Sequence, residues 1–152
     1  MSSSPSKAWF RATRERVGLT QKAMAERLGV LVDTVKKWEN PKYYAVPDDA
    51  TAFLSEALSA HVSAGGAAVE AVMAQSEEQG DQESVSLLYY RSQRQYDEYG
   101  RDPGDYAVID ARCREIAATL ETGGISVEYR YPEESDERMF TALANTRSKE
   151  KR

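Results

Sequence analysis

Two glycines, Gly18 and Gly29, break the start of the chain into short segments and limit what it can form there. Residues 8–17 carry apolar side chains near one face and charged side chains on the other, which predicts a first helix. Thr20 is a suitable N-cap for a second helix through Leu28, and Gly29 supplies the positive φ that ends a helix tightly. Apolar residues then continue at helical spacing, so we expect a helix-turn-helix bundle.

The charge of the chain is unevenly distributed. The 152 residues carry a net charge of −5, with 41% hydrophobic and 30% charged residues. Residues 1–46, however, hold nine lysines and arginines against four acids and are +5, whereas the remainder is −10. Such asymmetry indicates an N-terminal end that binds a polyanion and an acidic part that keeps the protein in solution.

The remainder of the chain predicts further helices and two strands. Alanine-rich residues 49–78 read as one helix, in which Gly65 and Gly66 mark a weak point or kink. Strand formers and helical patterns then alternate, giving strands at 84–91 and 125–131 and helices at 92–99 and 106–121. The fold class expected is mainly α, α+β overall, with the helix-turn-helix bundle followed by a small α+β module, for which a resemblance described below implies a role in dimerisation.

Composition also predicts the domain limits. Residues 1–46 form the expected helix-turn-helix domain, and residues 47–135 form a helical and α+β domain; the resemblances described below imply DNA binding for the first and dimerisation for the second. Residues 136–152 are a charged tail, expected to form at most a short helix before a disordered end.

A longer motif spans the two glycine-bounded helices and the segment after them. The pattern R-x-x-x-G-L-T-Q-x-x-x-A-x-x-L-G-V…T-V-x-x-W-E, from Arg14 to Glu39, resembles the helix-turn-helix domain of the phage-repressor-like, xenobiotic-response-element family of regulators. The resemblance implies that a helix enters the DNA major groove. It also implies a structural ion pair between Arg14 and Glu39 and a phosphate contact by Gln21.

We expect a set of DNA-binding residues, for which the resemblance implies Gln21 and the exposed positions of residues 32–37. They are polar, basic or short side chains of the second and third helices and the loop after them: Thr20, Gln21, Lys22, Val32, Asp33, Thr34, Lys36, Lys37, Asn40 and Lys42. Two positions depart from the family pattern, because Leu31 stands where a capping Ser or Thr is usual and Pro41 where Gly is usual. Asp33 is an alternative cap, which would shorten the helix and rotate its contacts.

A second resemblance covers most of the remaining chain. WENPKYYAVPDDA and YDEYGRDPGDYAVIDARCREIAATLETGG are similar to segments of anti-CRISPR-associated repressors that carry an appended dimerisation domain. This resemblance implies a homodimer that represses its own operon from an inverted repeat.

Several other functions lack the residues they need. The only cysteine, Cys113, excludes an intramolecular disulfide, and the acids around residues 77–83 do not have the spacing of a calcium loop. We expect no catalytic residues, no metal site and no cofactor. We also expect a cytoplasmic protein, because no apolar run reaches the roughly 18 residues of a membrane helix and no secretory signal is apparent.

The sequence therefore predicts a dimeric, sequence-specific, double-stranded DNA-binding transcriptional regulator, a repressor of its own operon, and not an enzyme. The alternative is an antitoxin-type regulator whose C-terminal half binds a partner protein.

Overall fold

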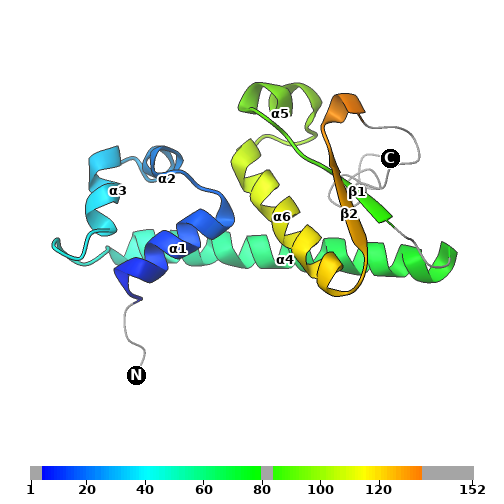
Figure 1. Ribbon diagram of the computed structural model, residues 1–152. Helices are drawn as coiled ribbons and strands as arrows, with labels where there is room; N and C mark the ends of the chain where they lie inside the picture. Colours follow the sequence, from blue (N-terminus) through cyan, green and yellow to red (C-terminus); the bar gives the residue numbers. More distant parts are fainter. Residues whose placement is uncertain (1–4, 80–83, 135–152) are drawn as a thin grey trace. The chain divides into compact units, whose positions relative to one another are not determined.

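The computed structural model describes residues 5–79 and 84–134 of the chain, which are mainly helical with one small sheet (Figure 1). The predicted fold class, mainly α with an α+β part, is confirmed. The elements in chain order are α1 (Lys7–Val17), α2 (Gln21–Leu28), α3 (Val32–Trp38), α4 (Asp48–Gln79), β1 (Ser84–Leu88), α5 (Gln93–Tyr99), α6 (Tyr106–Thr122), β2 (Ser126–Arg130) and the 3-10 turn η1 (Pro132–Glu134). The predicted tail, 136–152, lies outside the described residues.

The chain divides into two compact units, Met1–His61 and Val62–Arg152. The division falls inside α4, whereas the sequence placed a domain limit at residues 46 and 47, just before that helix begins. The first unit therefore includes the first half of α4, from which Ala50 and Leu54 are buried.

Local chemistry explains the first two helices. The hydroxyl of Ser6 accepts a hydrogen bond from the backbone N–H of Trp9 at 3.0 Å, which caps α1. The predicted cap of α2 is present, with the Thr20 hydroxyl accepting from Ala23 N–H at 2.9 Å. Both helices end at a glycine in the left-handed region, with φ of 86° at Gly18 and 68° at Gly29.

Apolar side chains from all parts of the first unit fill its core. The largest of them that are fully buried are Phe10, Val17, Met24, Val35 and Leu54. Trp38 of α3 meets Phe10 of α1 edge to face, with ring centroids 5.9 Å apart. This core holds α3 against the helices that precede it.

Helix α4 continues through Gly65 and Gly66, where the sequence predicted a kink. Its segment Asp48–Gln75 is long and apolar enough to be a membrane-span candidate, with mean hydropathy 1.2 in a window that is 17% buried. Glu56 and Glu70 interrupt this segment, so it holds no unbroken apolar run of about 18 residues and the sequence expectation is not contradicted. The indication is weak, because core helices of soluble proteins meet the same criterion, and it does not mark the chain as a membrane protein.

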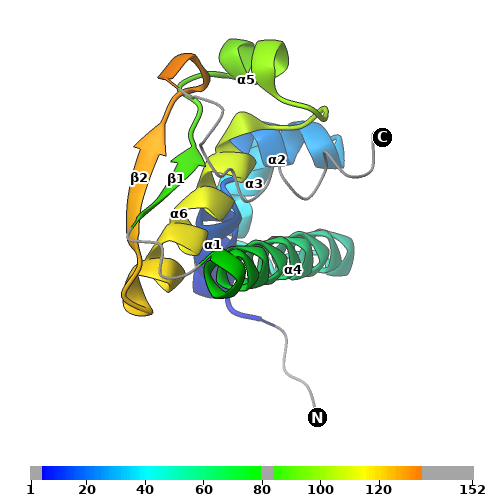
Figure 2. The same cartoon turned by 90° about the vertical axis from the view of Figure 1, so that its right-hand side faces the viewer.

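The second unit contains a two-stranded parallel sheet. β1 and β2 pair in register from Ser84 with Ser126 to Leu88 with Arg130. Parallel strands need a long crossover connection, which α5 and α6 supply. Figures 1 and 2 show α6 alongside the two strands, where it packs on them.

One cluster of buried residues forms the core of the second unit. It joins α4, β1 and α6 through Ala68, Val72, Val85, Leu87, Cys113, Ile116, Ala117 and Leu120. The sequence pattern of the 106–121 helix predicts an apolar stripe of Ile109, Cys113, Ile116 and Leu120, and all of these except Ile109 lie in this cluster. The opposite face of the sheet is more polar, with the Ser86 hydroxyl 3.3 Å from the Glu128 carboxylate.

A buried carboxyl group lies beside this core. Asp110 of α6 is almost fully buried, and its Oδ1 accepts a hydrogen bond from the backbone N–H of Tyr90 at 2.9 Å. Removal from water raises the pKa of Asp110 to about 6, against the lowering effects of the Tyr90 hydrogen bond and Arg114. Ionisation of Asp110 therefore lowers the stability of the fold at neutral pH.

We predict that Asp110→Asn stabilises the protein by about 1–2 kcal/mol at pH 7, because asparagine keeps the acceptor for Tyr90 N–H and removes the buried charge. Between about pH 4 and 6 the folded wild type binds a proton that the unfolded chain has lost, so its stability falls as pH rises. The advantage of the variant should therefore be near zero at pH 4 and reach its full size above pH 6.

Urea unfolding followed by circular dichroism measures this difference. The exposed Asp97→Asn is the matched control and should show no such growth with pH. An advantage for Asp110→Asn that is the same at pH 4 and pH 7 would contradict the buried charge as its cause.

Candidate nucleic-acid interface

Helices α2 and α3 form the candidate interface, joined by a tight turn at Gly29. Val30 N–H donates to Ala25 O at 3.0 Å across this turn, and α2 and α3 pack directly on each other. Helix α3 begins at Val32 with Leu31 as its N-cap, so Asp33 lies in the first turn. The alternative in which Asp33 caps a shortened helix is therefore wrong.

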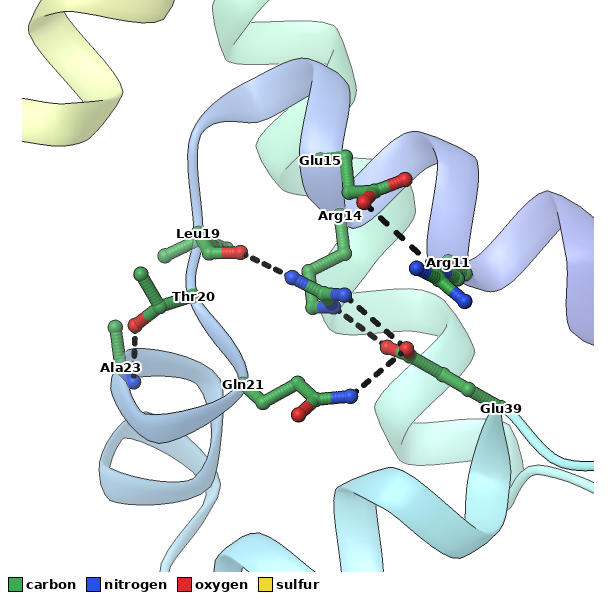
Figure 3. A network of polar contacts seen from close by, with 8 residues as sticks. All are labelled: Arg11, Arg14, Glu15, Leu19, Thr20, Gln21, Ala23 and Glu39. Carbon is green, nitrogen blue, oxygen red and sulfur yellow. Dashed lines mark hydrogen bonds and ion pairs between the residues drawn. The ribbon is translucent and has the colours of Figure 1, made fainter.

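A buried ion pair connects α1 to the C-terminal end of α3 (Figure 3). Arg14 Nε and Nη2 donate to the two carboxylate oxygens of Glu39 at 2.5 and 3.1 Å. Only 8% of the Arg14 side chain and 5% of the Glu39 side chain are exposed. The third nitrogen, Nη1, donates to Leu19 O at 2.8 Å, so the guanidinium also fixes the link between α1 and α2. The pair expected from the family resemblance is present.

Gln21 joins the same network from the first position of α2. Its Nε2 donates to Glu39 Oε1 at 3.1 Å, as Figure 3 shows. An amide nitrogen carries two hydrogens, so one remains for an acceptor from outside the protein. The arrangement holds the amide at a fixed place and is compatible with the phosphate contact predicted for Gln21.

Lys7 also contacts the C-terminal end of α3. Its ammonium group donates to the backbone oxygens of Lys37 at 3.2 Å, Trp38 at 3.0 Å and Tyr44 at 2.5 Å. A cation at this end of a helix satisfies carbonyls that have no partner within the helix and complements the helix dipole. This residue could not be predicted from the sequence, because its partners lie 30 to 37 positions away and no spacing rule connects them.

The structure leaves every residue predicted to bind DNA at least partly exposed. Five are exposed and five are half-buried, whereas Val35 and Trp38 of the same helix α3 point into the core. The exposed residues are Thr20, Lys22, Asp33, Lys36 and Lys42, and the half-buried residues are Gln21, Val32, Thr34, Lys37 and Asn40. Their roles at DNA stay predictions.

The two lysines of α3 differ in their surroundings. Lys37 lies 3.2 Å from the Asp33 carboxylate one turn earlier and 5.6 Å from the centre of the Tyr43 ring. The hydrogen bond to Asp33 and its charge raise the pKa of Lys37. Lys36 is exposed and forms no ion pair among residues 5–79 and 84–134. Lys36 is therefore the more available of the two for a phosphate.

The remaining polar residues lie where α3 ends. Asn40 Oδ1 accepts from the backbone N–H of Lys42 at 2.9 Å and shapes the turn that follows the helix. Tyr43 and Tyr44 in that turn are exposed, with 47% and 58% of their surfaces open. No group of three His, Cys, Asp or Glu residues in the described part of the chain could hold a metal ion.

Comparison of the sequence with protein-family models and with curated proteins gave no significant match. The interpretation of the interface therefore depends on its geometry and charge.

We predict that Arg14→Ala lowers the free energy of unfolding of the first unit by about 3 kcal/mol, because it leaves the buried Glu39 carboxylate without its charge partner. Arg11→Ala is the matched control on the same helix. Its pair with Glu15 leaves 64% and 55% of the two side chains exposed, so we expect a loss below about 0.5 kcal/mol.

Urea unfolding followed by tryptophan fluorescence reports on this unit, because both tryptophans of the chain, Trp9 and Trp38, belong to it. Equal losses for the two arginine variants would contradict a special structural role for the Arg14–Glu39 pair.

Proposed function

We propose that the protein is a sequence-specific regulator that binds duplex DNA through α3 and acts as a homodimer. The observation that carries the proposal is the α2–α3 pair, with a Thr-capped first helix, a left-handed glycine turn and an outer surface of short and basic side chains. In helix-turn-helix proteins the second helix of such a pair lies in the major groove and the first crosses the phosphate backbone.

Charge supports a polyanion as the ligand. Residues 1–46 are +5 in a chain that is −5 overall, so the candidate interface lies in the basic part. Lysines at the surface would neutralise phosphates and release counterions, which supplies affinity that does not depend on sequence. Val32, Thr34 and Asp33 are short enough to approach base edges, the first two by apolar contact with thymine methyl groups and Asp33 by accepting from cytosine.

The second unit is the proposed dimerisation element. Its sheet has only two strands among the described residues, so each strand has one edge without a strand partner. Tyr99, Tyr129 and Tyr131 are exposed on this unit, and tyrosine is enriched at protein interfaces. A two-fold dimer would present two α3 helices to grooves about one DNA turn apart, roughly 34 Å, and so would require an inverted repeat.

The proposal includes autorepression, which requires such a repeat upstream of the gene for this protein. It also includes a cytoplasmic location, because the DNA that the protein would bind lies in the cytoplasm. A palindrome close to the start of the gene would support autorepression. A neighbouring reading frame for a small toxic protein would favour the antitoxin alternative.

We predict that the logarithm of DNA affinity falls linearly with the logarithm of salt concentration, and that Lys36→Ala makes this slope shallower by about 1. Lys37→Ala should weaken binding less, because Lys37 must first give up its contact with Asp33. Arg94→Ala, an exposed basic residue of α5, is the matched control and should leave the slope unchanged.

Fluorescence anisotropy with a labelled duplex at several salt concentrations measures these slopes. Affinity that does not change with salt would contradict the proposed electrostatic contact.

We predict that the full chain is a dimer in light scattering and that residues 1–61 form a folded monomer with much weaker operator binding. The fragment ends at residue 61 because Ala50 and Leu54 belong to the core of the first unit. The loss arises because a monomer contacts one half-site and loses the high effective concentration of the second helix. A monomeric full chain, or a fragment that binds as tightly as the dimer, would remove dimerisation from the mechanism.

A further inference from the structure

Leu31 is the most exposed large apolar side chain in the described part of the protein. Its exposure is 74%, and the next highest, that of Tyr44, is 58%. It directly precedes α3, the helix assigned to the major groove, and its backbone oxygen accepts from Thr34 N–H at 3.0 Å. Its side chain therefore lies on the surface beside the residues proposed to read bases.

Leu31 occupies a position where a polar residue would stabilise the DNA-free protein more. Helices α1, α2 and α5 each begin with a Ser or Thr whose hydroxyl accepts a backbone N–H, at Ser6, Thr20 and Ser92. Leu31 stands at the matching position of α3 and makes no such hydrogen bond. Leucine is a poor N-cap, so the position lacks stabilisation that three other helices of this protein have.

The chemistry of the side chain restricts what it can contact in DNA. Leucine neither donates nor accepts hydrogen bonds, so it gains nothing from a phosphate. The main apolar group on the base edges of the major groove is the C5-methyl group of thymine. The surrounding segment is +5 and suits a polyanion, which favours DNA over an apolar protein surface as the occupant.

We propose that Leu31 is a specificity-determining residue that contacts a thymine methyl group in each half-site. This inference rests on the proposed function and extends it by one residue and one base-edge group. Leu31 does not make the helix-cap hydrogen bond that a serine would make, and it contributes discrimination between bases instead.

The test uses the full-length protein and duplexes that it selects from a random library. Each thymine in a selected duplex is replaced in turn by deoxyuridine, which lacks only the methyl group. Loss of the methyl group that Leu31 contacts should weaken wild-type binding about three- to fivefold. Leu31→Ala identifies that position in each half-site, because any methyl group contacted by Val32 or Thr34 should keep its effect in this variant. Leu31→Ala and Leu31→Ser should bind the thymine and deoxyuridine duplexes equally at that position. Lys36→Ala is the control, with weaker binding to both duplexes and the same ratio between them.

Leu31→Ser also separates recognition from a structural role. A serine hydroxyl can cap α3, so the variant should unfold at a temperature about 3 °C higher while losing the preference for thymine. A lower unfolding temperature would overturn the inference, as would a wild type without any methyl-sensitive position or a Leu31→Ala variant that keeps the full preference. If the protein enriches no duplex at all, the proposed function fails, and the inference fails with it.

Discussion

The bidentate ion pair between Arg14 and Glu39 fixes the end of α3 to α1, and the orientation of every exposed side chain on α3 depends on it. Gln21 and Leu19 add further hydrogen bonds to the pair, so neither charge is buried without partners. Lys7 holds the same helix end through three backbone oxygens. A helix of seven residues would have little stability alone, and these contacts with its core packing make it a fixed element.

In the proposed mechanism, the buried face of α3 holds the helix in place and its exposed face contacts DNA. Val35 and Trp38 face the core, while the lysines and short side chains face outward. A preformed surface loses little conformational entropy on binding, so more of its interaction energy appears as affinity. Leu31 fits this division, because its missing cap weakens the free helix only modestly while the ion pair and the core hold the helix in place.

Much of the fold was predictable because local chemistry decides it. Thr20 and Gly29 bound α2, and apolar spacing located α1, α4 and α6 to within about two residues at each end. The parallel pairing of Val85 with Val127 was not predicted, because pairing across 42 positions depends on tertiary packing. The contacts of Lys7 and the division of the chain inside α4 also depend on tertiary packing, so they were not predicted either. The partners of Arg14 came from a family resemblance, and the DNA contacts remain predictions.

Hydroxyl-radical footprinting of the full-length protein on duplexes recovered from fragmented genomic DNA tests the central claim most directly. The account predicts two symmetric protected regions, centred about one helical turn apart, over an inverted repeat. A single protected region, or no recovered fragment with a defined footprint, would contradict a dimer that reads DNA through two copies of α3.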